Sequence, residues 1–276
     1  ITGATGSGKS TTVYSMLQKL NKEESNIITV EDPVEMSIEG LNQVQVNSEI
    51  GLDFATVLRS ILRQDPNIIL IGEIRDTETA KIAIRASITG HLVLSTLHTN
   101  NSLTTIERLI DMDVERYLLS SSLKGIISQT LAKRLCPNCR IQRPANETEK
   151  ILFKKTLGID IESIYEAGRC DHCHNGYTGR IALQEVLMIN EEIRDAINRS
   201  MDREDLKHLI YKKGVKTLFQ DGLIKVMEGI TDLKEVFRLV DYDDYDEVSE
   251  ELLDKTLGID KKEETETSKI MDSMLY

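Results

Sequence analysis

Residues 3–10 constrain this 276-residue chain more than any other segment, because their sequence, GATGSGKS, fits the phosphate-loop pattern G-x-x-x-x-G-K-[ST] without a mismatch. The glycines of this pattern let the backbone wrap around phosphates, so that successive N–H groups point inward. We expect Lys9 to reach the β- and γ-phosphates and the Ser10 hydroxyl to bind Mg²⁺. The sequence therefore predicts a site for a nucleoside triphosphate, and its phosphate-binding residues are Gly3, Ala4, Thr5, Gly6, Ser7, Gly8, Lys9, Ser10 and Thr11.

A helix is expected to begin near Lys9, and residues 11–20 support it because their apolar residues recur at helical spacing. These residues are Val13, Met16, Leu17 and Leu20. The positive end of such a helix favours an anion at the loop. A buried strand normally precedes a phosphate loop, and only Ile1 and Thr2 stand there. We therefore expect the chain as given to be incomplete at its start.

Strand-like and helix-like segments alternate through the first half of the chain. Strands are expected at residues 27–30, 67–72 and 91–96, and helices at 54–62, 77–89 and 103–110. This alternation is typical of a parallel sheet covered by helices. After Glu115 the pattern turns helical and breaks at Cys136-Pro137. Beyond it we expect a strand at 181–186 and helices at 191–197, 202–213, 218–227 and 233–239.

The sequence predicts four parts. These are a nucleotide-binding core over residues 1–135, a cysteine-containing insert over 136–180, a mostly helical part over 181–240 and an acidic tail over 241–276. The tail has 13 acidic and 4 basic residues, so it accounts for −9 of the net charge of −12. We expect this tail to be mobile, or ordered only against a partner. The nearly balanced remainder lacks a basic footprint, and we therefore expect no nucleic-acid partner. No apolar run approaches the roughly 18 residues that span a bilayer.

Acidic residues follow two of the expected strands, where ligand sites of α/β proteins form. Hydrolysis of a triphosphate needs a metal-binding acid, a group that orients or deprotonates water, and positive charge for the transition state. Glu73 follows the strand at 67–72 and resembles a Walker B acid, with Glu in place of the usual Asp. Glu31 and Asp32 end the strand at 27–30. The alternative is that either strand-end acid is merely solvated.

Other candidates for this chemistry are His98, after the strand at 91–96, and three arginines. Arg59 and Arg63 are four residues apart, so one helix face would present both to a single anion. Arg75 lies two residues after Glu73. A loop histidine with an ordinary hydrogen bond, and arginines in surface ion pairs, are the plainer interpretations of the same residues.

Five motifs in order resemble a known family. They are residues 3–10, 29–35 (TVEDPVE), 58–66 (LRSILRQDP), 71–76 (IGEIRD) and 89–100 (TGHLVLSTLHTN). Together they resemble the Walker A loop, the Asp box, an arginine-bearing segment, the atypical Walker B motif and the His box of the type II secretion and type IV pilus assembly ATPases. The resemblance covers about residues 1–240.

The resemblance implies an α/β fold with a RecA-like P-loop NTPase core, a zinc-binding insert and a C-terminal helical part, acting as a ring-shaped homo-hexamer. Glu31 and Glu73 would handle water and Mg²⁺, and the choice of general base between them stays open. His98 would contact nucleotide phosphate. The three arginines would stabilise phosphate charge, some of them across a subunit boundary, and they are Arg59, Arg63 and Arg75.

Four cysteines form two C-x-x-C pairs, Cys136 with Cys139 and Cys170 with Cys173. Two such knuckles are typical of a closed, tetrahedral structural Zn²⁺ site. Disulfides or a redox pair are the alternatives, and neither suits a protein that resembles a cytosolic enzyme without a thioredoxin context. His172 and His174 are possible substitute ligands. In family terms, the tetracysteine element resembles the assembly and secretion branch, since the pilus retraction ATPases lack it.

The resemblance therefore implies a cytoplasmic, Mg²⁺-dependent ATPase at the inner face of the cytoplasmic membrane, with ATP, Mg²⁺ and structural Zn²⁺ as cofactors. Its partners would be an inner-membrane platform protein and other cytoplasmic components of a pilus or secretion machine, through which it would associate peripherally with the membrane. The alternatives are a pilus-retraction or type IV secretion ATPase, and a nucleotide-binding scaffold that does not hydrolyse ATP.

Overall fold

The computed structural model describes residues 1–212 and 214–240, so the predicted acidic tail lies outside the described residues. The chain forms two compact units. Among the described residues, unit 1 comprises 1–131 and 182–218, and unit 2 comprises 132–181 and 219–240. Among the described helices, none combines the length and the hydrophobicity that a transmembrane span requires.

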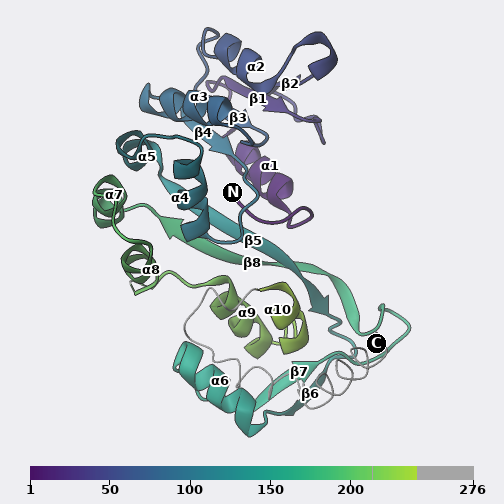
Figure 1. The fold of residues 1–276 in the computed structure, drawn as a ribbon. Coiled ribbons are helices and arrows are strands. Elements are labelled where there is room, and N and C mark those ends of the chain that lie inside the picture. Colours follow the sequence, from purple (N-terminus) through teal and green to yellow (C-terminus); the bar gives the residue numbers. More distant parts are fainter. Residues whose placement is uncertain (213, 241–276) are drawn as a thin grey trace, which may run out of the picture. The chain divides into compact units, whose positions relative to one another are not determined.

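Unit 1 is built on a parallel four-stranded sheet with the strand order β2-β1-β3-β4 (Figure 1). Its strands are β1 (Ile27–Glu31), β2 (Asn42–Gln45), β3 (Ile68–Ile71) and β4 (Leu92–Ser95). Every residue of β1 and β3 is buried. Helices cover both faces of the sheet, which explains why these two strands are nearly continuous apolar runs instead of alternating ones.

The two faces of the sheet pack into separate hydrophobic clusters, because successive strand residues point to opposite sides. On one side Ile27 and Leu70 pack with Leu17 of α1 (Lys9–Leu20). On the other side Ile69 and Ile71 join a larger cluster built with the remaining helices of the unit. Those helices are α2 (Phe54–Ile61), α3 (Thr77–Ile88), α4 (Ser102–Asp111), α5 (Arg116–Ser122), α7 (Glu191–Asn198) and α8 (Arg203–Lys212).

The predicted alternation of strands and helices in the first half is confirmed, and so is the α/β fold class with its parallel sheet. In the first half of the chain, two strands differ from expectation. The edge strand β2 (NQVQ) is short, polar and partly exposed, so it carries no apolar signature. The stretch predicted to be helical after Glu115 contains α5 but then becomes β5 (Gly125–Leu135), which pairs with β8 (Tyr177–Met188).

Unit 2 contains an antiparallel pair, β6 (Ile141–Pro144) with β7 (Ser163–Glu166), which is joined by α6 (Glu147–Leu157). Asn146 and Glu149 form a capping box at the start of α6, and Gly158 ends the helix with φ 70°. The helices α9 (Leu218–Met227) and α10 (Leu233–Leu239) complete the unit. Its core includes Phe219 and Phe237, whose ring centroids lie 5.7 Å apart.

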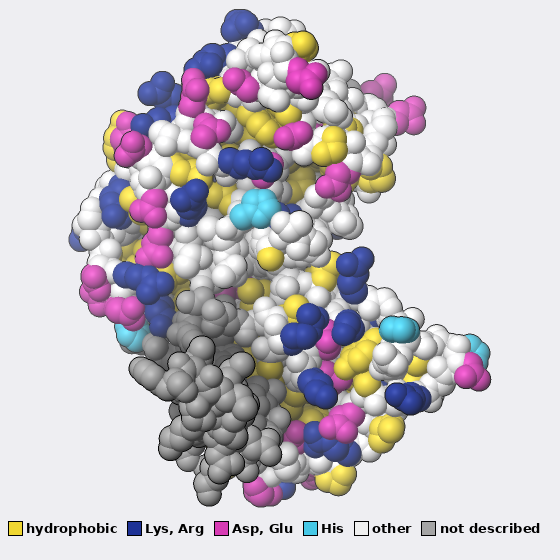
Figure 2. Space-filling view, turned by 45° about the vertical axis from the view of Figure 1, so that its right-hand side comes forward, with side chains coloured by type: hydrophobic (Ala, Val, Ile, Leu, Met, Phe, Trp, Pro, Cys, Tyr) yellow, Lys and Arg dark blue, Asp and Glu magenta, His cyan; other side chains and the backbone are white. Residues whose placement is uncertain are grey.

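Charged side chains of both signs are interspersed over the face shown in Figure 2. This mixture agrees with the small net charge that the sequence leaves on residues 1–240. A mixed surface of this kind has no extended region of purely positive or purely negative electrostatic potential on that face.

Candidate active site

The phosphate loop is shaped by three glycines with positive φ: Gly3 at 149°, Gly6 at 80° and Gly8 at 87°. L-residues rarely adopt these angles. At Gly3 there is also no room, because a Cβ atom would lie 2.2 Å from the Gln129 carbonyl oxygen. The helix α1 begins at Lys9, directly after the loop, so its positive end faces the region that the loop encloses. The local geometry is therefore that of an anion site.

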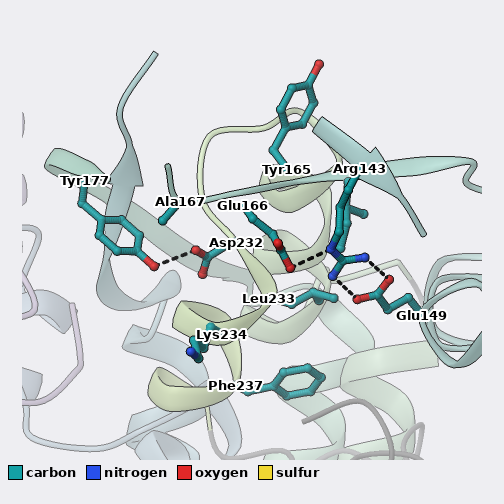
Figure 3. Close-up of a pocket in the computed structure, with 11 residues that line it drawn as sticks. Arg143, Glu149, Tyr165, Glu166, Ala167, Tyr177, Asp232, Leu233, Lys234 and Phe237 are labelled. Carbon is teal, nitrogen blue, oxygen red and sulfur yellow. Dashed lines mark hydrogen bonds and ion pairs between the residues drawn. The ribbon is translucent and has the colours of Figure 1, made fainter. Parts of the chain in front are cut away.

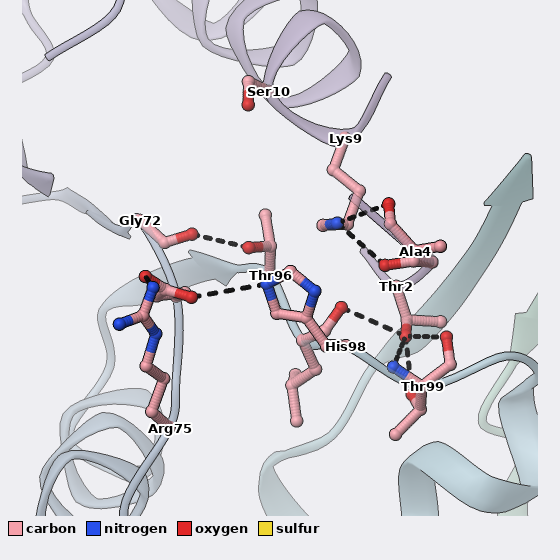
Figure 4. Close-up of polar contacts among 12 residues, drawn as sticks. Thr2, Ala4, Lys9, Ser10, Gly72, Arg75, Thr96, His98 and Thr99 are labelled. Atoms are coloured by element: carbon pink, nitrogen blue, oxygen red, sulfur yellow. Dashed lines mark hydrogen bonds and ion pairs between the residues drawn. The ribbon is translucent and has the colours of Figure 1, made fainter. Parts of the chain in front are cut away.

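Lys9 folds back over this loop. Its ammonium group donates hydrogen bonds to the carbonyl oxygens of Gly3, at 2.7 Å, and Ala4, at 3.0 Å (Figure 4). Burial lowers the pKa of Lys9, and the negative charge of Glu73 partly offsets that effect. The Ser7 hydroxyl is buried without a hydrogen-bond partner among the described residues. An ammonium group held by two carbonyls and an unused hydroxyl suit a phosphate ligand, which would supply the missing acceptors.

Ser10, the predicted Mg²⁺ ligand, lies in the first turn of α1. Its hydroxyl donates a hydrogen bond to Oε1 of Glu35 at 3.0 Å. Sequence reasoning did not select Glu35, although it closes the TVEDPVE motif. A carboxylate beside this hydroxyl is chemically suited to Mg²⁺, which prefers oxygen ligands.

Glu31 is the last residue of β1, and its carboxylate is buried. Oε1 accepts hydrogen bonds from the hydroxyl of Thr29, at 2.5 Å, and the amide of Gln43, at 3.1 Å. Oε2 accepts the hydroxyl hydrogen of Tyr14. The same Tyr14 oxygen accepts the N–H of Glu35 at 3.2 Å. Burial, and then the bond to Glu31, raise the pKa of Tyr14 to about 12.

Glu73 follows β3 on the neighbouring strand, and its side chain is 11% exposed. Oε1 pairs with Arg75 at 2.5 Å, and Oε2 lies 3.4 Å from Nε2 of His98. The segment that carries His98 is held by Thr96, whose hydroxyl donates to the Gly72 carbonyl at 2.6 Å. In Figure 4 the His98 ring lies between Arg75 and the Lys9 side chain.

Gly72 allows the two acidic strand ends to approach closely. A Cβ atom at this position would lie 3.2 Å from both the Cα atom of Glu31 and the carbonyl oxygen of Val30. The parallel register of β1 and β3 pairs Val30, one residue before Glu31, with Ile71, two residues before Glu73. The structure therefore brings Glu31 and Glu73 to the same edge of the sheet as the phosphate loop.

Two of the predicted arginines do not join this cluster. Arg59 forms an exposed ion pair with Glu78, which lies in the first turn of α3. Arg63 lies beyond the end of α2 and donates to the Arg59 carbonyl oxygen at 2.8 Å. Of the three predicted arginines, only Arg75 contacts one of the acidic candidates in the described part of the chain.

The four cysteines of unit 2 converge, with their sulfur atoms all within 4.8 Å of one another. Cys136 and Cys170 are 3.8 Å apart, and Cys173 lies 3.6 Å from both Cys139 and Cys170. Ligands at about 2.3 Å in a tetrahedron around Zn²⁺ are separated by about 3.8 Å, so the cluster has the size of a zinc site. These distances exclude S–S bonds of about 2.05 Å. His172 and His174 are not part of the cluster.

The backbone around this cluster is too crowded for larger residues. A Cβ atom at Gly168 would lie 1.9 Å from the Cys139 carbonyl oxygen, and one at Gly176 would lie 2.5 Å from the Gly168 carbonyl oxygen. The Cys136 N–H donates to the Gly176 carbonyl at 2.8 Å. The two knuckles are therefore held together by direct backbone contacts as well as by their thiols.

A cavity of about 310 Å³ lies elsewhere in unit 2, beside β7 and α10 (Figure 3). Three of the charged side chains that line it pair with one another, and Asp232 is held by a tyrosine. Arg143 binds both oxygens of the buried Glu149 and also Glu166, at 2.6 to 2.8 Å. The Tyr177 hydroxyl donates to Asp232 at 2.6 Å. These pairs fasten β6, α6, β7, β8 and the start of α10, which indicates a structural role for the groups around the cavity.

Comparison with known proteins agrees with the motifs. The family model described as "Type II/IV secretion system protein" matches residues 1–238. The chain is 50% identical to the "Putative type II secretion system protein E" of Escherichia coli, over 87% of this chain and 48% of that protein. It is 47% identical to the "Type IV pilus assembly ATPase PilB" of Thermus thermophilus, over 86% of this chain and 27% of that protein.

Among solved structures, the pilus retraction motor PilT with bound ADP is 32% identical, with a TM-score of 0.65, over 86% of this chain and 59% of that chain. The chain spans about half the length, or less, of the curated relatives that it matches. The match of the family model over nearly all described residues shows that the chain belongs to the type II/IV secretion system protein family.

Proposed function

We propose that this protein is a Mg²⁺-dependent ATPase that powers type II protein secretion or type IV pilus assembly. The observation that carries the proposal is the meeting of Lys9, Glu31 and Glu73 at one edge of the sheet. This arrangement places a phosphate-binding lysine beside two carboxylates. Hydrolysis of a triphosphate needs such groups to bind the phosphates, to bind Mg²⁺ and to orient water. The names of the relatives at 45–50% identity support the choice of process.

In this proposal the loop N–H groups and Lys9 bind the phosphates of ATP, and the Ser10 hydroxyl holds Mg²⁺. When bound, Mg²⁺ would neutralise negative charge that develops on the phosphates. The Ser10 hydrogen is directed at Glu35, which leaves the oxygen lone pairs of Ser10 free to face a cation. Arg75 and His98 hold the carboxylate of Glu73 from two sides.

We assign the general base to Glu73 and a positioning role to Glu31. Oε1 of Glu31 already accepts two side-chain hydrogen bonds and Oε2 accepts a third, so a water molecule finds little free acceptor capacity there. The Glu73 carboxylate lies opposite His98, a half-exposed side chain that can move aside for water or phosphate. A base must come within hydrogen-bond reach of the water that it deprotonates.

The protein would act as a homo-hexamer at the cytoplasmic face of the membrane, bound to a membrane platform protein. Exposed Arg59 would reach the nucleotide of a neighbouring subunit, together with Arg63, since neither lies at the site of its own chain. The tetracysteine cluster would hold a structural Zn²⁺ that fastens the insert. We also propose four functional parts: a core, an insert, a helical part and a tail. Their boundaries lie at residues 135, 180 and 240.

The test uses the full chain and measures both ATP binding and phosphate release. Lys9→Ala is expected to lose ATP binding. Glu73→Gln is expected to bind ATP and to lose turnover by about 10²- to 10⁴-fold, the usual contribution of a general base. Glu23→Gln is the matched control, because Glu23 is an exposed carboxylate outside the site, and it should behave as wild type.

A nucleotide-binding scaffold is the competing function. It predicts ATP binding without phosphate release, and identical behaviour of wild type and Glu73→Gln. That result, obtained with protein that is shown to bind ATP, would overturn the ATPase proposal. A loss of turnover in Glu31→Gln with no loss in Glu73→Gln would instead reverse the assignment of the base.

A further inference from the structure

Gln129 lies beneath the phosphate loop, in β5, and is 2% exposed. Its side-chain N–H donates to the carbonyl oxygen of Ser7 at 2.7 Å. Its side-chain oxygen accepts two hydrogen bonds at 2.9 Å, from the Thr12 hydroxyl and from the amide of Gln184 in β8. One amide therefore bridges the loop, the first helix and the neighbouring strand.

The backbone of Gln129 supports the same loop. Its N–H donates to the Thr2 carbonyl at 2.9 Å. Its carbonyl oxygen fills the space where Gly3 would carry a Cβ atom, and its side-chain nitrogen lies 2.9 Å from the Cβ position of Gly8. Two of the glycines in the motif are thus required by Gln129 as well as by their own φ angles.

The chemistry of the loop explains why an amide is needed here. When loop N–H groups turn inward to bind phosphate, some loop carbonyls must turn the opposite way, into the protein. A buried carbonyl without a donor destabilises the folded state. Gln129 supplies a donor to Ser7 and accepts two hydrogen bonds with its oxygen, which uses both lone pairs. A carboxylate could accept these bonds but could not donate to Ser7.

We propose that Gln129 is a positioning residue that holds the phosphate loop in its anion-binding conformation, and that Gln184 fixes the orientation of the Gln129 amide. The inference rests on the proposed nucleotide binding and deepens it. Without the donor, the peptide after Ser7 is free to rotate, and the N–H group of Gly8 loses its fixed direction toward phosphate.

The test compares ADP with AMP, because their difference isolates the β-phosphate that the loop and Lys9 hold. Affinities of the full chain for both nucleotides are measured by competition with a fluorescent ADP analogue. Gln129→Met, which keeps the length but loses the polar atoms, removes the one side-chain hydrogen bond to the loop, that to the Ser7 carbonyl. It should therefore weaken ADP binding about tenfold and AMP binding much less. Gln129→Glu should weaken ADP more, since it adds a negative charge beside the loop.

Ser128→Ala is the matched control. Ser128 is fully buried in the same strand, and its hydroxyl has no hydrogen-bond partner among the described residues. Its ADP-to-AMP affinity ratio should equal that of wild type. If Gln129→Met fails to fold, Gln184→Met serves instead and should lower the same ratio by a smaller factor.

The outcomes separate this inference from the proposed function. Wild-type protein that does not bind ADP refutes the nucleotide site itself. Wild-type protein that binds ADP, with an unchanged ADP-to-AMP ratio in folded Gln129→Met, refutes the positioning role alone. Equal weakening of ADP and AMP also refutes it, because a general loss of structure acts on both nucleotides.

Discussion

Replacing Tyr14 with Phe should destabilise unit 1 and release the carboxylate of Glu31. The change removes only the hydroxyl group, which donates to Glu31 and accepts the Glu35 N–H. Hydrogen bonds to carboxylates contribute about 1.5–3 kcal/mol net, and the pair is buried, so we expect a loss of about 2 kcal/mol. For a unit of this size that corresponds to a fall of about 4–8 °C in Tm.

The pH dependence of stability provides a second measurement on the same variant. In the folded protein the pKa of Tyr14 is about 12, above the ordinary 10.0. A pKa that is raised by folding stabilises the folded state fully below pH 10, and this contribution disappears as the pH rises through 12. The stability difference between wild type and Tyr14→Phe should therefore shrink across that window, as followed by urea unfolding at a series of pH values.

Tyr117→Phe is the control, because Tyr117 is 62% exposed and its hydroxyl has no hydrogen-bond partner among the described residues. It should leave both the free energy of unfolding and its pH dependence unchanged. If Tyr14→Phe matches wild type within about 0.5 kcal/mol, the usual range of a neutral surface change, the buried hydrogen bond does not hold Glu31.

Two further predictions concern unit 2. Cys139→Ser should reduce the zinc content, measured by elemental mass spectrometry, and lower the protection of unit 2 amides against hydrogen exchange. Retained zinc with unchanged protection would contradict a four-thiolate site. Arg143→Met should cost about 3–5 kcal/mol, because it leaves the carboxylate of Glu149, 3% exposed, without its bidentate partner. Arg199→Met removes only an exposed ion pair with Asp195 and should cost less than about 1 kcal/mol in the same unfolding assay; equal costs would contradict the argument from burial.

The parts of the fold that could be predicted are those where burial and sequence pattern agree. β1 and β3 are nearly continuous apolar runs because the sheet is covered on both faces. The helices α2 and α3 begin at conventional N-caps, Asp53 and Asp76. β2 could not be predicted, since an edge strand with polar residues resembles a loop in sequence. The acids at strand ends were predictable from position alone, because topology places the carboxyl ends of parallel strands together.

The residues that sequence reasoning missed are mostly buried polar ones. Tyr14 occupies a core position of α1, where its ring follows the helical pattern and its hydroxyl carries no sequence signal. The strand β5 was predicted to be helical for a related reason. Its buried positions include Ser128 and Gln129, whose polarity breaks the apolar alternation by which a strand is recognised.

Gln129 thus makes β5 harder to recognise as a strand in the sequence, and it also supports the phosphate loop. Both effects arise because its side chain is polar and buried. Most buried polar side chains are hydrogen-bonded, and that of Gln129 bonds to Ser7 in the loop, Thr12 in α1 and Gln184 in β8. A site that must hold backbone carbonyls away from its ligand needs such buried donors. In this family we therefore expect the strands that support the nucleotide loop to be harder to recognise from apolar patterns than the strands that merely build the sheet.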